Sequence, residues 1–293
     1  GAVGLSISSS KNSIIMNNNI FALGISAFSS TGSIGLSFHT SPNSIVSNNK
    51  ISTSASISYG GNTIIDSSPN SIISNNIFSS DIQPGLSISS SNNSIIMNNT
   101  ISTRNQGLSL YSITNSTISN NTILTSCVFG ACLSCPGTCQ AGLSLYSITN
   151  STISNNIISN LTNVNGVGVS IQDSNSVLLQ HNLIRFKKHG IFLSNPPSIG
   201  ITVRFSNIFN NSLYNVNNLQ LASILAEYNW WGTANETQIA QSIYDYFDNP
   251  AYGVVDFYPF LNSPFSPSII VIITQSLIDG IVGQFSSQEF IAT

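Results

Sequence analysis

The chain has 293 residues, of which 6% are charged, and its formal net charge is −3. Charged residues make up about a quarter of a typical soluble domain, so Ser, Thr and Asn must cover most of this surface. Seven Lys and Arg residues are too few for the clustered phosphate contacts of a nucleic-acid-binding protein. No uncharged apolar run reaches the length of about 18 residues that a membrane span needs.

Internal repeats run through most of the chain. Residues 107–121 read GLSLYSITNSTISNN, and residues 142–156 are identical to them. Residues 4–18 and 85–99 differ from each other at a single position. A repeat of a few tens of residues is typical of solenoid proteins. Weaker copies start at Gly35, Gly166 and Gly190, and another near Ser56 lacks the leading Gly-Leu.

The pattern within one repeat favours strands over helices. Leu108 and Leu110 alternate with Ser109 and Tyr111, which is the period of two that a strand requires. Short β-branched stretches follow, separated by Gly, Asn and Ser. We therefore expect an all-β fold, a single-stranded parallel β-helix of about nine coils. Strands of successive coils then pair at about 4.8 Å, and identical residues stack in columns.

A column of asparagines is expected inside this helix. The second Asn of each Asn-Asn pair precedes an apolar residue by one or two positions, and Asn tolerates the left-handed conformation of a sharp bend. Its amide can donate to one neighbouring coil and accept from the other, which forms a ladder. The predicted ladder contains Asn18, Asn49, Asn76, Asn99, Asn121, Asn156, Asn182 and Asn207, and Asn229 is a further candidate.

The recurring pattern N-S-I-I-S-N-N-x-I resembles the right-handed β-helix repeats of pectate-lyase-like and NosD-type secreted surface proteins. The resemblance covers about residues 1–262. Asn229-Trp230-Trp231-Gly232 and the later segment 253–261 resemble the closing part of many secreted β-helix proteins. The resemblance implies a right-handed helix. It specifies function poorly, because such repeats occur in lyases, hydrolases, epimerases, adhesins and structural proteins.

Three regions are predicted. Residues 1–232 form the β-helix, with a Cys-rich loop inserted at 124–141. Residues 233–262 form a cap, in which Asn235 begins a helix that places Ile239, Ile243 and Phe247 on one face. Residues 263–293 form a tail. Its apolar strand, Ile269, Ile270, Val271, Ile272 and Ile273, folds back on the rod or contacts another subunit.

Four cysteines lie in the inserted loop, at Cys127, Cys132, Cys135 and Cys139. In a secreted chain, two disulfides with three possible pairings are the favoured interpretation. A metal site with four thiolate ligands is the alternative, but the position of the fourth cysteine argues against it. We predict no metal and no cofactor.

The charged residues give no clear catalytic site. Asp66, Asp81 and Asp173 form no column of carboxylates, and His39 is expected to be structural. Trp230 and Trp231 are expected to pack in the core. One basic cluster is interpreted as a solvated turn between coils rather than a site for an acidic glycan. It contains His181, Arg185, Lys187, Lys188 and His189, with Arg204 nearby.

Several features favour secretion. The chain begins at Gly1, which indicates a mature chain whose signal segment has been removed. Sequons for N-linked glycans occur throughout, and a secreted location would make some of them true sites. We expect an extracellular or cell-surface protein. The sequons begin at Asn92, Asn98, Asn115, Asn120, Asn150, Asn160, Asn210 and Asn235.

The favoured function is a non-enzymatic structural subunit that stacks end to end into a filament or surface layer, so that its main partner is a second copy of itself. Low charge, duplicated coils, a first coil without a cap and an apolar tail support this prediction. A polysaccharide lyase or hydrolase of the pectate-lyase-like type is the alternative. A third possibility is an adhesin that binds surface glycans without turnover.

Overall fold

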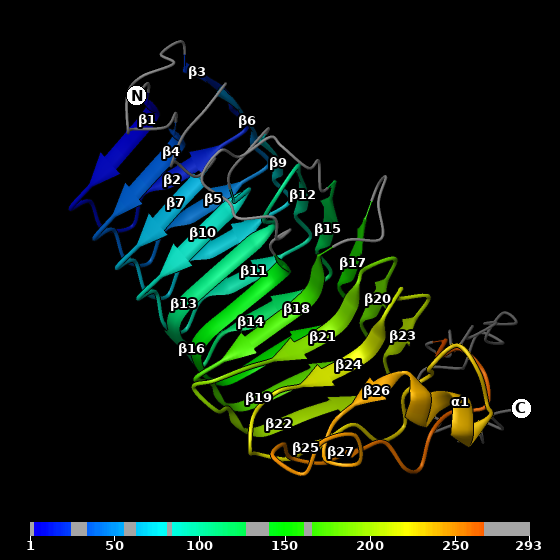
Figure 1. The fold of residues 1–293 in the computed structure, drawn as a ribbon. Helices are drawn as coiled ribbons and strands as arrows, with labels where there is room; N and C mark the ends of the chain where they lie inside the picture. The colour runs from blue at the N-terminus through cyan, green and yellow to red at the C-terminus, as the bar shows by residue number, and fades with distance from the viewer. Residues whose placement is uncertain are drawn as a thin grey trace, which may run out of the picture.

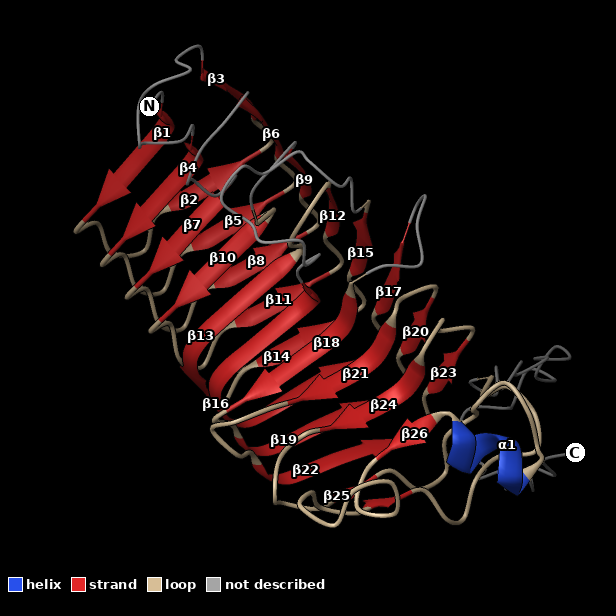
Figure 2. Cartoon of the chain, in the orientation of Figure 1, coloured by secondary structure: helices blue, strands red, loops and turns tan. Residues whose placement is uncertain are grey.

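The computed structural model describes residues 3–24, 34–55, 63–80, 84–126, 141–160 and 166–266. They form a rod of stacked coils with three strand-lined faces (Figures 1 and 2). All strand pairs along the rod are parallel, and each strand pairs with the equivalent strand one coil away. The predicted parallel β-helix is therefore confirmed.

Face 1 carries the longer strands and looks toward the viewer in Figure 1. Its strands are β1 (Val3–Ser8), β4 (Ile34–His39), β7 (Thr63–Asp66), β10 (Leu86–Ser89), β13 (Leu108–Thr114), the first part of β16 (Ala141–Ser154), β18 (Val167–Gln172), β21 (His189–Leu193), β24 (Tyr214–Asn218) and β26 (Ile243–Tyr244).

Face 2 continues the same 19-stranded sheet around a bend, because β16 runs through both faces. Its other strands are β2 (Ile14–Met16), β5 (Ile45–Ser47), β8 (Ile72–Ser74), β11 (Ile95–Met97), β14 (Thr117–Ser119), β19 (Asn175–Gln180), β22 (Ile199–Arg204), β25 (Ile224–Leu225) and β27 (Val255–Asp256).

Face 3 is a separate eight-stranded sheet. Its strands are β3 (Asn19–Gly24), β6 (Lys50–Ala55), β9 (Ile77–Ser80), β12 (Thr100–Thr103), β15 (Thr122–Thr125), β17 (Ile157–Asn160), β20 (Leu183–Arg185) and β23 (Asn207–Phe209).

The core consists of aliphatic columns that point inward from all three faces. In one coil, Leu108 and Leu110 come from face 1, Ile118 from face 2 and Ile123 from face 3, and each is fully buried. A glycine at or directly before the start of most face-1 strands allows this packing. A Cβ on Gly107 would lie 2.3 Å from Ile123 Cγ2 and 2.4 Å from the Gly142 carbonyl oxygen. The recurring Gly-Leu thus marks the point where the faces come closest.

Asparagine side chains line the bend between faces 2 and 3. Asn99 donates from its backbone N and from Nδ2 to Asn121 Oδ1, both at 3.0 Å, and Asn121 bonds to Asn156 in the same way. The ladder is continuous from Asn18 to Asn182. These side chains satisfy backbone groups that the bend would otherwise leave buried without partners.

Asn207 does not belong to the ladder, contrary to the prediction. The next position is Ser206, whose Oγ accepts from Asn182 N at 3.1 Å, and Asn229 then accepts from Ser206 N. Instead, Asn207 Nδ2 donates to the backbone oxygen of Phe265 at 3.0 Å, and the backbone N of Phe265 donates to Asn207 Oδ1 at 2.7 Å. Asn207 therefore attaches the start of the tail to the rod.

The left-handed bend lies one residue earlier than expected. The first Asn of each pair has a positive φ, for example 55° at Asn120, and its side chain is exposed. Two serine ladders at the bend between faces 1 and 2 were not predicted. In one of them, Ser94 N donates to Ser116 Oγ at 3.0 Å, and Ser116 N donates to Ser151 Oγ at 3.1 Å.

The chain closes with α1 (Glu236–Gln241), in which Asn235 Oδ1 accepts from Gln238 N at 3.1 Å. Ile239 and Ile243 are buried as expected, but α1 ends before Phe247, which is 80% exposed. Trp231 is buried in the core and Trp230 is half-buried. None of the described helices is long and apolar enough to cross a membrane.

Candidate functional site

Two rows of side chains point outward from face 1 and run along the rod. The first, here called the tyrosine row, contains in order His39, Asp66, Ser89, Tyr111, Tyr146 and Gln172. The second, here called the serine row, contains Ser87, Ser109, Ser144 and Ser170. Successive members belong to neighbouring strands and are therefore about 4.8 Å apart.

His39 and Asp66 lie beside each other at one end of the tyrosine row. His39 Nδ1 lies 3.6 Å from Asp66 Oδ2, and the two side chains are 43% and 35% exposed. His39 is therefore a surface residue in contact with Asp66, and its expected structural role stays a prediction. Asp66 also accepts hydrogen bonds from Ser89 Oγ at 2.6 Å and from Ser67 Oγ at 3.2 Å.

The electrostatics of this pair favour an ionised aspartate. The hydrogen bond from Ser89 is the main cause that lowers the pKa of Asp66, with further lowering by Ser67 and His39, while partial burial opposes them. An ionised Asp66 at Nδ1 orients the His39 ring, so that Nε2 can take a proton. Among the described residues, this is the one His–carboxylate pair within 4 Å.

Tyr111 and Tyr146 stack beside this pair. Their ring centroids are 5.0 Å apart and the planes differ by 5°. Tyr146 therefore covers one face of the Tyr111 ring. The opposite neighbour of Tyr111 is Ser89, which is too small to cover the other face, and Tyr111 is 52% exposed. An apolar ring face thus looks along the row toward Asp66.

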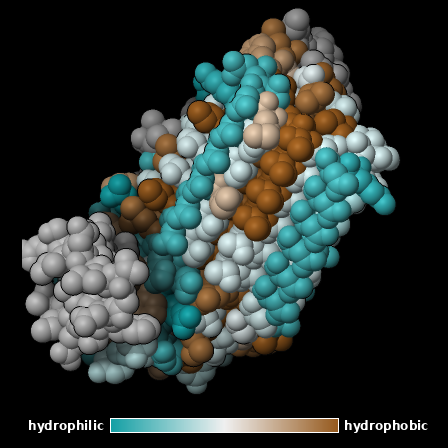
Figure 3. All heavy atoms as spheres, turned by 180° about the vertical axis from the view of Figure 1, so that it is seen from behind, coloured by the Kyte–Doolittle hydropathy of each residue, from teal (hydrophilic) through white to brown (hydrophobic). Residues whose placement is uncertain are grey.

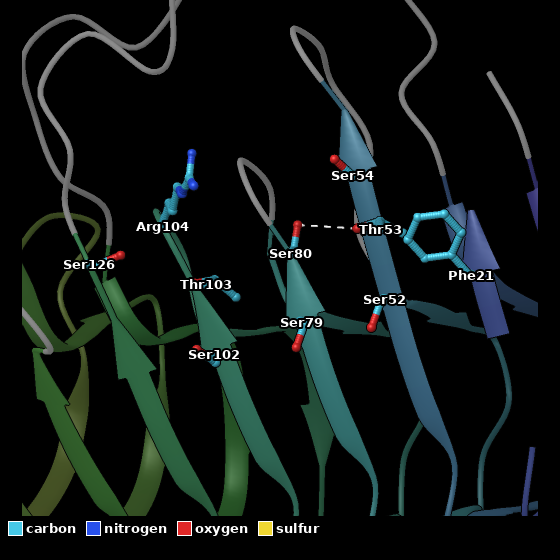
Figure 4. Close-up of a pocket in the computed structure, with 10 residues that line it drawn as sticks. All are labelled: Phe21, Ser52, Thr53, Ser54, Ser79, Ser80, Ser102, Thr103, Arg104 and Ser126. Carbon is cyan, nitrogen blue, oxygen red and sulfur yellow. Dashed lines mark hydrogen bonds between the residues drawn. The ribbon is translucent and has the colours of Figure 1, made fainter. Parts of the chain in front are cut away.

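A cavity of about 360 Å³ lies elsewhere, at the carboxyl ends of β6, β9, β12 and β15 (Figure 4). Hydroxyl groups dominate its lining, and the described lining residues include no carboxylate or imidazole. It offers polar contacts but no acid–base pair. The lining residues are Phe21, Ser52, Thr53, Ser54, Ser79, Ser80, Ser102, Thr103, Arg104 and Ser126.

The basic cluster is not a solvated turn throughout. Lys187 is fully buried, and its Nζ donates at 2.6 Å to Thr125 Oγ1 and to Asn160 Oδ1. Burial lowers the pKa of Lys187 to about 7. Asn160, a predicted glycan acceptor, is held by these contacts. His189 is half-buried, and its ring stacks on Tyr214 with centroids 5.8 Å apart.

The other predicted glycan acceptors lie mostly at the surface. Asn98, Asn115, Asn120, Asn150 and Asn210 are exposed and have a positive φ. Asn235 is exposed but caps α1. Asn92 is half-buried, and its Oδ1 accepts from Thr114 N at 2.9 Å.

Two predicted features lie outside the described residues. They are the cysteines, Cys127, Cys132, Cys135 and Cys139, and the apolar strand of the tail, residues 269–273. Within the described part of the chain, no group of three or more His, Cys, Asp or Glu side chains is placed to hold a metal ion.

An apolar stripe lies on face 2, away from the site. Figure 3 shows it between two hydrophilic stripes. Ile14, Ile45, Ile72 and Ile95 stand in one outward register on this face, and Ile14 is 65% exposed. The same register continues with Thr117 and Thr152.

The family model for a right-handed β-helix region matches residues 1–140 and 57–208. The chain belongs to the right-handed β-helix family. The crystal structure of the periplasmic alginate epimerase AlgG is similar, with a TM-score of 0.60 and 15% identity over 88% of this chain and 70% of that chain. This similarity establishes the fold. No curated protein matches the sequence significantly.

Two further solved β-helix structures are more distant. The catalytic domain of a GH87 α-1,3-glucanase has a TM-score of 0.37 and 11% identity, over 88% of this chain and 64% of that chain. The A-module of the Azotobacter vinelandii mannuronan C-5 epimerase AlgE4 has a TM-score of 0.33 and 12% identity, over 89% and 84%.

Proposed function

We propose that this protein binds a polysaccharide along the outer surface of face 1 and acts outside the cytoplasm. The tyrosine row is the observation that supports the proposal. It places an uncovered ring face of Tyr111, the small Ser89 and the Asp66–His39 pair in one line. A sugar ring above Ser89 would stack on Tyr111 and donate hydroxyl hydrogen bonds toward Asp66.

Further support comes from composition and from the fold. The low charge and the hydroxyl-rich surface suit an extracellular or periplasmic setting. AlgG is a periplasmic enzyme of alginate, so the same fold serves a polysaccharide-modifying protein there. The filament expected from the sequence has less support, because its predicted contact strand lies outside the described residues.

The binding test is titration of the protein with soluble polysaccharides, measured by calorimetry. We expect Tyr111→Ala to weaken binding about tenfold, which corresponds to about 1.4 kcal/mol. Tyr228→Ala is the matched control, because this exposed tyrosine lies at the bend between faces 2 and 3. Equal losses in both variants, or no saturable binding by the wild type, would contradict the proposal.

Turnover is a second candidate function, favoured by the His39–Asp66 pair alone. In hydrolysis, His39 Nε2 would take a proton from an attacking water, whose oxygen bonds to the anomeric carbon as the glycosidic C–O bond breaks. The leaving oxygen would take a proton from solvent, and the Asp66 carboxylate would stabilise the imidazolium. We then expect His39→Gln to abolish product formation while binding persists. If His39→Gln formed product as fast as the wild type, His39 would be excluded as the base. If the wild type formed no product, binding would be left as the one proposed activity.

A further inference from the structure

The serine row forms a flat strip with defined ends. Ser87, Ser109, Ser144 and Ser170 are half-buried, so their hydroxyl groups form its floor. Ile64 precedes them and Phe192 follows them in the same register. Five strand spacings separate Ile64 from Phe192, which is about 24 Å. The strip therefore lies between two apolar side chains.

Tyr111 and Tyr146 border this strip on one side, because each lies two residues after a serine of the row on the same strand. Beyond Phe192 the aromatic surface continues, since its ring lies 5.7 Å from His189, and His189 lies 5.8 Å from Tyr214. Neighbouring serines are about 4.8 Å apart, which is close to the length that one pyranose unit adds to an extended 1,4-linked chain. Four serines thus match a segment of about four sugar units.

The charges on face 1 select among polysaccharides. Its strands from β1 to β26 contain no Lys or Arg, and Asp66 is their one carboxylate. Lys188 is exposed immediately before β21, beyond the serine row. A polyuronate carries a negative charge on every sugar, which the row would leave unmatched and which Asp66 would repel. A neutral glycan needs only hydroxyl and ring contacts.

We infer that the serine row holds about four units of a neutral polysaccharide that runs parallel to the rod. This inference rests on the proposed function and narrows it to a substrate class. The wild type should bind neutral tetrasaccharides at least tenfold more tightly than disaccharides, with little further gain at six units. Uronate oligomers of the same lengths should bind at least tenfold more weakly.

The test uses cello-, manno-, xylo- and chito-oligosaccharides of two to six units, and oligogalacturonates as the charged series. Ser109→Trp should fill the row and reduce tetrasaccharide affinity at least tenfold. Ser119→Trp is the matched control, because Ser119 is half-exposed on face 2 of the same coil. A second variant, Ser144→Arg, should gain affinity for oligogalacturonates, whereas Ser119→Arg should not.

The outcomes separate the two proposals. If neutral and charged series bind equally, or if affinity does not rise beyond two units, the inference about the serine row fails. The proposed function still stands in that case if Tyr111→Ala weakens binding and Tyr228→Ala does not. Full affinity in Ser109→Trp would also overturn the inference. If no polysaccharide or oligosaccharide binds the wild type, the proposed function itself fails.

Discussion

Lys187 is a buried amine with no carboxylate partner among the described residues, so its protonation should make stability depend on pH. Its Nζ contacts the hydroxyl of Thr125 and the amide of Asn160, and Gly142 packs beside it. Burial holds the folded pKa near 7, below the ordinary value of 10.5. Below about pH 7 the folded chain must bury a charged amine, and above about pH 10.5 the amine is neutral in both states.

Stability should therefore rise as the pH increases from 7 to 10, by about 1.4 kcal/mol per pH unit from this group, because only the unfolded chain then binds the proton. Lys187→Met should remove this increase and should be more stable than the wild type at pH 6. Chemical denaturation at pH 6, 8 and 10 measures both effects. Lys188→Met is the exposed control and should keep the wild-type slope. If the free energy of unfolding changed equally with pH in the wild type and in Lys187→Met, the titration of Lys187 would be ruled out as the cause.

The two members of an Asn-Asn pair should respond differently to the same substitution. Asn121 donates from Nδ2 to Ile96 O and to Asn156 Oδ1, and it accepts from Asn99. Asn121→Ala leaves buried groups without partners and should cost about 2–4 kcal/mol. Asn120→Ala should cost about 1 kcal/mol, because Asn120 is exposed and loses only its tolerance of the left-handed conformation.

Thermal unfolding compares these variants with Asn121→Ser. The serine should recover part of the loss, because Ser206 occupies the equivalent position in the native ladder and accepts from Asn182 N. Equal costs for Asn120→Ala and Asn121→Ala would show that the ladder adds nothing to stability.

Only part of the candidate site could be predicted from the sequence. His39 and Asp66 both directly precede a Ser or Thr followed by Ser-Pro-Asn-Ser-Ile, and alignment on that motif places them in one register. Alignment on the leading Gly-Leu misses this, because the coil of Asp66 lacks it. Burial of Lys187 could not be predicted, since a run of basic residues gives no sign of which side chain turns inward.

At the scale of the strand, Gly107, directly before β13, should tolerate no side chain. The Cβ of Gly107→Ala would collide with backbone as well as with Ile123, so the two faces must separate. We expect a loss of about 2–3 kcal/mol. Ser109→Ala, two residues later and facing outward, should change stability by less than about 0.5 kcal/mol. Urea denaturation of both variants measures the contrast.

Strand positions and the aliphatic columns followed from the period-two pattern, because inward residues repeat in every coil. The serine ladders did not follow from it, since serine is common at both exposed and buried positions of this chain. The length of α1 was overestimated for a related reason. Ile239, Ile243 and Phe247 share a helical spacing, but Asp245 accepts backbone hydrogen bonds from Phe247 and Val255 and forms a turn there.

At the scale of the whole molecule, residues 107–121 and 142–156 are identical in sequence. We therefore expect that one of these two coils can be removed. Deletion of residues 107–141 joins Gln106 to Gly142, so that residues 142–156 meet β10 and β11 in place of the identical residues 107–121. On face 3, β12 would pair with β17, and Thr103 would replace Thr125 beside Asn160 and Lys187. Every inward column therefore continues across the join.

The shortened chain should fold cooperatively, with β-rich circular dichroism and a melting temperature only a few degrees lower, because one coil of burial is lost while all interfaces remain native. Deletion of residues 112–141 is the control. It places Gly142 directly after Tyr111, where the bend at Ser112 is needed, and breaks the register of every following strand. If both deletions unfold the protein, the coils are not interchangeable, and the inserted segment between them contributes to folding of the rod.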